Sequence, residues 1–179
     1  MKKISLLLML FFLGHTTYAL NKKDSIAILQ IKELGVYYLH NDTIVKITPI
    51  MPENTKVRAN PLSVKSTLVY EGEVSEHILV NEPEFFIFIP KEYKTRINVK
   101  QFRLVTLSSK NGKRKINVGS FSMLGSRTGA KTKTFDIMTL NEECYKIFAK
   151  EPMPIGHYGI FYNYYGGIPG KLYDFDIRE

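Results

Sequence analysis

Two aspartates near the end of the chain are spaced as a pair that could do chemistry. Asp174 and Asp176 stand two residues apart within 172–177, a segment whose composition predicts a strand, so their side chains share one face. Two carboxylates on one face can bind calcium or flank a glycosidic bond. They can equally form the solvent side of a strand whose other side is apolar, and we favour this interpretation. The apolar side then consists of Tyr173, Phe175 and Ile177.

Histidine and cysteine give no comparable pattern. Three histidines follow residue 19, each alone in its own segment, and no pair has the His-x-x-x-His spacing of zinc ligands. They are His40, His77 and His157. Cys144 has no neighbouring histidine that would activate a thiolate nucleophile. We therefore predict neither a metal site nor a cofactor.

A glycine-rich stretch comes close to a nucleotide-binding motif. Residues 125–132 read Gly-Ser-Arg-Thr-Gly-Ala-Lys-Thr, one substitution from a phosphate-binding loop, because Ala130 stands where the second glycine belongs. Such a loop works only in front of a helix whose N-terminus holds the phosphates. Residues 132–140 alternate like a strand instead. We therefore predict that 119–130 is a long mobile loop without a nucleotide.

Two clusters are the candidates for binding. A basic set around 110–115 and the following loop is either a solvated face or a site for an anionic partner such as lipid or polysaccharide. Tyrosines crowd 158–165, where they supply contact area with a polar tip, although Tyr158 and Tyr162 can equally belong to the core. The candidate binding residues are Tyr162, Tyr164, Tyr165, Lys113, Arg114, Lys115, Arg127 and Lys131.

The elements that position these residues are predicted to be strands. Between Pro83 and Pro90 lie five consecutive apolar residues, three of them Phe, which indicates a strand buried on both faces near the middle of the core. Asn41-Asp42 and Asn111-Gly112 each join two strand-like segments, a pattern typical of tight hairpins. Further strands are predicted at 26–31, 55–59 (an edge), 63–70, 77–80, 134–140, 144–149, 156–165 and 172–177, and solvated sequence at 91–96.

This pattern predicts an all-β fold. No segment of ten or more residues has apolar positions at helical spacing together with a cap. Ten or so short strands with frequent turns are typical of a single antiparallel β-sandwich or barrel-like domain. We expect residues 20–179 to form this one domain.

The first nineteen residues are predicted to be a cleaved signal peptide. Two lysines precede an apolar run at 4–13, and the segment ends in the small residue Ala19. The run is too short to cross a membrane, and the absence of a cysteine near Leu20 argues against a lipoprotein. We expect a periplasmic or secreted protein that is not transmembrane. Its formal charge of +8 is only weak support for a nucleic-acid partner, which we do not predict.

Several aromatic positions resemble those of a known group. The chain has Pro83-x-Phe85-Phe86-x-Phe88, then Gly156-x-Tyr158, and finally Tyr173-Asp174-Phe175-x-Ile177. This pattern resembles that of an uncharacterised family of exported bacterial all-β domain proteins. The resemblance implies a small exported β-domain, and it supplies no catalytic residues.

These observations favour a non-catalytic binding or accessory module of the bacterial envelope, with a protein, glycan or lipid as its unidentified partner. A hydrolase acting on an envelope or extracellular polymer is an alternative, with Asp174 and Asp176 as its carboxylates. A periplasmic inhibitor or immunity protein is a second alternative. An enzyme would need a concave site in which titratable groups converge.

Overall fold

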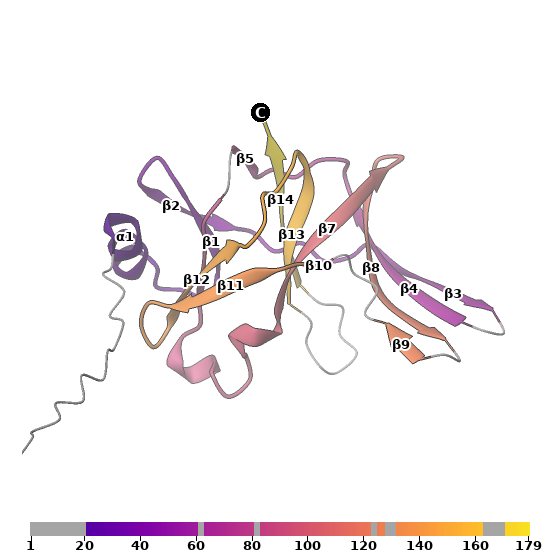
Figure 1. The fold of residues 1–179 in the computed structure, drawn as a ribbon, viewed down its shortest axis with the longest axis horizontal. Helices are drawn as coiled ribbons and strands as arrows, with labels where there is room; N and C mark the ends of the chain where they lie inside the picture. Colours follow the sequence, from indigo (N-terminus) through magenta and orange to yellow (C-terminus); the bar gives the residue numbers. More distant parts are fainter. Residues whose placement is uncertain (1–20, 61–62, 81–82, 123–124, 128–131, 163–170) are drawn as a thin grey trace, which may run out of the picture.

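The computed structural model describes residues 21–60, 63–80, 83–122, 125–127, 132–162 and 171–179, with side chains except at 63, 118–122 and 125–127. These residues form two β-sheets and one α-helix (Figure 1). The first sheet has the order β11 (Phe135–Thr139), β12 (Cys144–Ala149), β6 (Phe85–Phe88), β1 (Gly35–His40), β2 (Thr43–Ile47), with every pair antiparallel.

The second sheet is larger. Its order is β3 (Asn54–Asn60), β4 (Ser63–Glu71), β8 (Lys113–Ser122), β7 (Phe102–Lys110), β13 (Gly156–Tyr162), β14 (Lys171–Arg178), β5 (Ile78–Val80). In addition β9 (Gly125–Arg127) pairs with β8, and β10 (Thr132–Lys133) pairs with β7. All pairs are antiparallel except β14 with β5, which is parallel. The prediction of an all-β fold, a sandwich or a barrel-like domain, is confirmed, and the two sheets correspond to a sandwich.

The main core lies between the two sheets. Alternate residues of the first sheet, such as Phe85 and Ile87, pack against alternate residues of the second, such as Ile160 and Phe175. The rings of Phe85 and Phe175 have their centroids 4.6 Å apart. This layer is rich in aromatic side chains, which bury the most apolar area per residue and so dominate the energy of a core.

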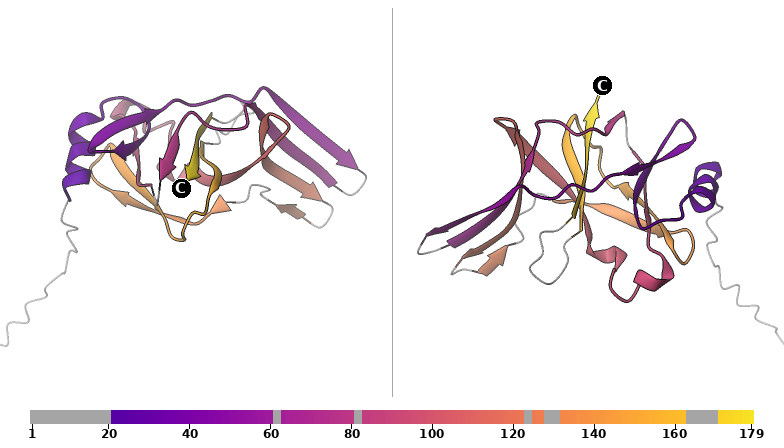
Figure 2. Two further views of the ribbon diagram at one scale, coloured as in Figure 1. Left: turned by 90° about the horizontal axis from the view of Figure 1, so that it is seen from above. Right: turned by 180° about the vertical axis from the view of Figure 1, so that it is seen from behind.

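Strand β6 is buried on both faces, as its sequence predicts. Phe85 and Ile87 point into the main core, whereas Phe86 and Phe88 belong to a second apolar cluster on the outer face of the first sheet. That outer face is covered by helix α1 (Lys22–Gln30), which contributes Ala27. Figure 2 shows the helix packed at the end of the molecule next to this sheet.

The helix itself corrects a prediction, because 26–31 was expected to be a strand. Asn21 caps it by accepting a hydrogen bond from the backbone N–H of Asp24 at 2.9 Å, a preferred N-cap arrangement. Asp24 is buried and forms an ion pair with the buried Lys146 of β12, whose Nζ lies 3.0 Å from Oδ1. Asp24, Ala27 and Ile31 recur at helical spacing on the covered face, and so short a pattern is indistinguishable from a strand in the sequence.

A third apolar cluster lies on the far face of the second sheet. It includes Tyr70 of β4, Val105 of β7 and Leu172 of β14. The connection from β2 to β3, residues 48–53, crosses this face and is called the strap below. Its Ile50 exchanges two backbone hydrogen bonds with Leu172, at 2.8 and 3.3 Å. The central strands β13 and β14 are thus covered on both sides.

Part of the second sheet extends away from the body (Figures 1 and 2). We call it the wing: β3, β4 up to Thr67, β8 from Asn117, and β9. A β-bulge falls in the β4–β8 pairing between Ser66 and Thr67, where the wing begins. Bulges bend a sheet locally, which accounts for the change of direction. All seven residues of β3 are exposed.

The hairpin predictions are confirmed. Asn41 and Asp42, with φ of 48° and 59°, turn β1 into β2, and Asn111 and Gly112, at 55° and 71°, turn β7 into β8. The long loop predicted at 119–130 is wrong in part, because β8 continues to Ser122 and is followed by β9. Sequence at 91–96 holds the 3-10 turn η1 (Lys91–Tyr93), and η2 (Val99–Gln101) precedes β7.

Within the described ranges, no helix is both long and apolar enough to span a bilayer.

Candidate functional site

The two aspartates of β14 are buried, which corrects the prediction that they face solvent. Asp174 and Asp176 are 4% and 2% exposed, because the strap and the segment 71–77 cover this face of the sheet. Asp174 forms a buried ion pair with Arg114 of β8. Arg114 also donates from Nη2 to the carbonyl of Glu71 at 3.1 Å and from Nε to that of Gly72 at 3.2 Å. The expectation that Arg114 contributes to a solvated basic surface is therefore wrong.

Asp176 is held by several donors. Its Oδ1 lies 2.8 Å from Nδ1 of His157, the residue paired with it on β13. Its Oδ2 accepts from the backbone N–H of Ser75 at 3.3 Å, and Arg178 lies 3.5 Å away. The hydroxyl of Ser75 donates in turn to the carbonyl of Asp174 at 3.0 Å and accepts from the N–H of His77 at 3.1 Å.

This polar cluster contains Ser, His and Asp without forming a catalytic triad. A triad needs the imidazole to receive the proton of the nucleophilic hydroxyl, but the hydroxyl of Ser75 donates to a backbone carbonyl. His157 contacts the carboxylate of Asp176, which meets the backbone N–H of Ser75 and not its hydroxyl. The cluster joins β14 to the segment 71–77, which is a structural task.

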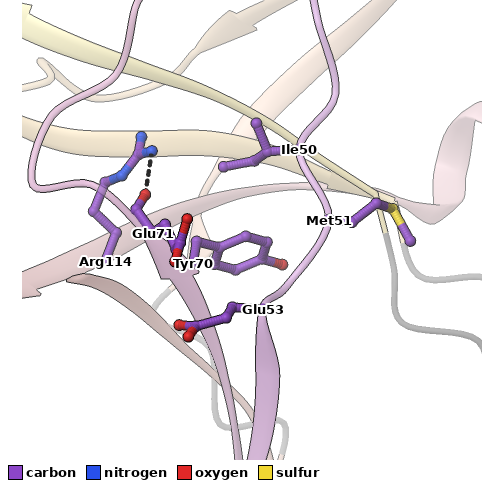
Figure 3. Close-up of a pocket in the computed structure, with 6 residues that line it drawn as sticks. All are labelled: Ile50, Met51, Glu53, Tyr70, Glu71 and Arg114. Atoms are coloured by element: carbon purple, nitrogen blue, oxygen red, sulfur yellow. Dashed lines mark hydrogen bonds between the residues drawn. The ribbon is translucent and has the colours of Figure 1, made fainter.

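Two adjoining cavities flank the strap. One, of about 450 Å³, is lined by Ile50, Met51, Glu53, Tyr70, Glu71 and Arg114. The other, of about 440 Å³, is lined by Thr48, Ile50, Glu71, Gly72, Val74, Glu76, His77, Arg114 and Asp174. Figure 3 shows the first cavity, with the ring of Tyr70 between Arg114 and the strap residues Ile50 and Met51.

Arg114, which lines both cavities, is balanced by a buried carboxylate. Burial lowers the pKa of the Arg114 guanidinium, and the charges of Asp176 and Glu76 oppose this shift. An arginine stays cationic under such a shift, so Arg114 balances Asp174. Burial also lowers the pKa of His77, which keeps its imidazole neutral at pH 7. The hydroxyl of Tyr70 is buried, and no hydrogen-bond partner for it occurs among the described residues.

The pairing register gathers basic side chains on one face of the wing. Paired residues of neighbouring strands point to the same side of a sheet. Arg58 of β3 pairs with Lys65 of β4, and Lys56 lies two residues before Arg58. Val69, four residues after Lys65 and so on the same face of β4, pairs with Lys115 of β8. The basic face consists of Lys56, Arg58 and Lys65 in the wing and of Lys113 and Lys115, which precede the wing on β8.

Four of these five cations have no counter-ion among the residues that the structure describes. Lys113 is paired with Glu53 of the strap, its Nζ lying 2.5 Å from Oε2. Lys56, Arg58, Lys65 and Lys115 form no ion pair with any carboxylate in the part of the chain that the structure describes. Lys56, Arg58 and Lys65 are exposed, and Lys115 is half-buried. The side-chain oxygen of Asn117, in the amide orientation that satisfies both its partners, accepts from Lys65 at 3.3 Å.

Of the five other candidate residues, one is buried, one lies on β9 and three lie outside the described residues. Tyr162 is 7% exposed and packs in the main core, where its hydroxyl donates to Oε1 of Gln101 at 3.1 Å, so it offers no binding surface. Tyr158 is buried in the same layer. Arg127 lies on β9, opposite Ser120 of β8. Tyr164, Tyr165 and Lys131 lie outside the described residues.

Sequence reasoning missed Lys56, Arg58 and Lys65. It identified 55–59 as an edge strand and 63–70 as its neighbour, but it drew no site from them. The available signal was the spacing Lys56-x-Arg58, which places both cations on one face of a strand. The pairing partner of this strand, and hence the convergence with Lys115, was not readable from the chain.

No group of three or more His, Cys, Asp or Glu side chains is placed to hold a metal ion within the described residues. Cys144 is buried under α1, and burial, with a smaller effect of the Asp24 carboxylate, raises the pKa of its thiol to about 12. A thiol that stays protonated is a poor nucleophile.

Comparisons with known proteins find no match: no protein-family model, no curated protein and no solved structure is similar to this chain.

Proposed function

We propose that the protein is a non-catalytic binding module, exported to the envelope or secreted, which docks an anionic partner on the basic face of the wing. One observation carries this proposal. Lys56, Arg58, Lys65 and Lys115 converge on one face without a counter-ion among the described residues. Like charges held side by side repel one another, and an anionic partner relieves that repulsion.

The state of the polar groups in the body supports a binding role over a catalytic one. A reaction centre needs titratable groups that are free to meet a substrate. Asp174 is neutralised by Arg114, and Asp176 is held by His157 and by the backbone of Ser75. These contacts fasten strands to one another, and the wing carries the side chains that remain available.

Binding to two simple anionic probes tests the proposal. One is heparin, a model polyanion, and the other is phosphatidylcholine vesicles containing phosphatidylglycerol. We expect binding at low salt that weakens as salt is added, because exposed charges are screened. The triple variant Lys56→Glu, Arg58→Glu, Lys65→Glu should bind roughly 100-fold more weakly, since each cation near an anionic surface contributes about 1 kcal/mol.

The matched control is Lys32→Glu, Lys94→Glu, Lys100→Glu, which changes the net charge equally at exposed lysines outside the wing. It should retain most of the affinity. Equal losses in the two triple variants would mean that overall charge, and not the basic face, determines binding. Absence of binding by the unmodified protein to heparin, to the vesicles and to any acidic peptide would contradict the proposal.

A hydrolase remains the second candidate, and one observation favours it. The cavity beside His77 has His77, Glu71, Glu76 and Asp174 among its lining residues. A screen of envelope and extracellular polymers with the purified protein tests it, with His77→Asn as the inactive control. A product released by the unmodified protein and not by this variant would establish the enzyme.

An inhibitor or immunity role would instead give one stoichiometric protein partner on crosslinking in native cells.

A further inference from the structure

Strand β3 is an open edge of the second sheet. Among the described strands it pairs only with β4, in an unbroken register from Asn54 to Asn60. Its sequence contains no proline, and no bulge interrupts its pairing with β4. An edge strand of this kind presents a row of backbone N–H and C=O groups on its outer side. Another strand can pair with such a row along its length, because its own N–H and C=O groups recur at the matching spacing.

The side chains of β3 alternate in chemistry as well as direction. Lys56 and Arg58 point to the basic face, while Val57 points to the opposite face and is 62% exposed. Val64 of β4 is 39% exposed on that same opposite face. Residues directly opposite on neighbouring strands interact, and opposite charges stabilise the pair. A strand that fits β3 therefore carries acidic residues at every second position and apolar residues between them.

A second copy of this chain is a poor occupant of the edge. Two β3 strands side by side would place Lys56 and Arg58 of one copy beside those of the other, and the chain as a whole has a formal charge of +8. Charged residues on an edge strand are a known protection against self-association. They leave the edge open to a partner of opposite charge.

We infer that β3 accepts an acidic β-strand from a partner protein, which extends the second sheet by one strand. This inference rests on the proposed function and specifies it, because it names the class of anionic partner. Backbone pairing supplies affinity, and the alternation of Lys56, Val57 and Arg58 supplies specificity.

The test uses peptides of alternating Glu and Val that are as long as β3, seven residues. In an extended peptide, successive N–H groups point to opposite edges of the strand. Two derivatives are therefore N-methylated at every second amide, one derivative with the N–H groups of one edge blocked and the other with those of the opposite edge blocked. We call these two patterns of methylation the two phases, and a peptide that pairs with β3 through one edge needs the N–H groups of that edge only. We expect the unmodified peptide to bind, one methylated phase to lose at least tenfold in affinity, and the other phase to bind nearly as well. Fluorescence anisotropy of labelled peptides measures all three.

Charge reversal on the protein provides the second arm. Lys56→Glu, Arg58→Glu should lose the Glu-Val peptide and gain a Lys-Val peptide of the same length. The control Lys32→Glu, Lys100→Glu should keep the original preference. Both lysines of the control are exposed and lie outside the wing.

The outcomes separate this inference from the proposal on which it rests. Equal binding of both methylated phases would overturn strand addition while leaving an anionic site on the wing. Binding of heparin or of anionic vesicles without binding of any peptide would do the same. If neither peptide, heparin nor vesicle binds, the inference and the proposed function both fail.

Discussion

Strands β4 and β8 pass through two regions with opposite characters. In the body, Leu68 and Tyr70 of β4 and Ile116 of β8 are buried in the cluster beneath the strap. In the wing, a few residues earlier on β4, Val64 and Lys65 are exposed. The same two strands are therefore a core element at one end and a surface element at the other.

The two regions differ in how their charged residues are placed. The body buries charged residues such as Arg114, Asp174 and Lys146, each with a partner. The wing exposes Lys56, Arg58 and Lys65 without a counter-ion in the described ranges. Regions with few buried contacts open at low free-energy cost and are the usual sites of binding. Substitutions in the body should change stability, and those in the wing should change binding alone.

Removal of Arg114 should have the largest effect. Arg114→Ala leaves the buried Asp174 without its partner, and breaking such a pair costs about 3–5 kcal/mol. Urea unfolding followed by circular dichroism measures the loss. The wing control, Arg58→Ala, should stay within about 0.5 kcal/mol of the parent, because Arg58 is exposed.

A double variant sharpens this test. Arg114→Leu, Asp174→Leu replaces both charges with apolar side chains and should be more stable than Arg114→Ala, because no unpaired charge remains buried. If the single and double variants lost equal stability, the cost would come from packing and not from the charge.

Substitution of Gly159, where neighbouring side chains and backbone approach closely, should cause the next largest loss of stability. Gly159 lies at the centre of β13, between Val105 of β7 and Asp174 of β14. A methyl group at this position meets the side chain of Leu172 and comes within 3.3 Å of the carbonyl of Tyr173. Overpacking of this kind costs about 1–3 kcal/mol, so Gly159→Ala should lower the melting temperature. Val57→Ala in the wing, which creates no such contact, should not.

Raising the pH above 9 should lower the free energy of unfolding through the thiol of Cys144. The pKa of its thiol is raised by burial from 9.0 to about 12, so the unfolded chain releases this proton before the folded protein does. Stability therefore falls as pH rises above 9, by about 1 kcal/mol between pH 9 and pH 10. Urea unfolding at the two pH values measures the decrease. Cys144→Ala should show a shallower slope, and an unchanged slope would assign the effect to other groups.

Removal of a single tyrosine hydroxyl should change stability least, and the effect should differ between Tyr158 and Tyr70. The hydroxyl of Tyr158 donates to the carbonyl of Pro154 at 2.8 Å, so Tyr158→Phe should cost about 1 kcal/mol. The buried hydroxyl of Tyr70 has no such partner among the described residues, so Tyr70→Phe should be neutral or slightly stabilising. Equal losses in urea unfolding would show that the Tyr70 hydroxyl makes a stabilising interaction in solution.

The fold was largely predictable because its signals are local. The five apolar residues between Pro83 and Pro90, and the turns at Asn41-Asp42 and Asn111-Gly112, act within a few residues of the chain. Helix α1 was missed because its one covered face is set by Lys146 and by the strands beneath it, which are far away in sequence.

The candidate site was less predictable, since charge alone does not reveal burial. Arg114 was grouped with Lys113 and Lys115, yet its alternation on β8 directs it inward to Asp174, sixty residues away. Lys56 and Arg58 were passed over because their convergence with Lys115 depends on two strand registers. Registers of this kind follow from tertiary packing.

The ion pair between Asp24 and Lys146 leads us to expect a particular order of events during folding. The two residues are 122 positions apart, so the segment that holds α1 cannot be secured until β12 exists and has joined β6. Closing such long loops is entropically costly and slows folding. We therefore expect α1 to be among the last elements to become fixed, and until it docks Phe86 and Phe88 lack the cover that Ala27 provides. Apolar surface exposed in this way makes a folding intermediate prone to aggregation.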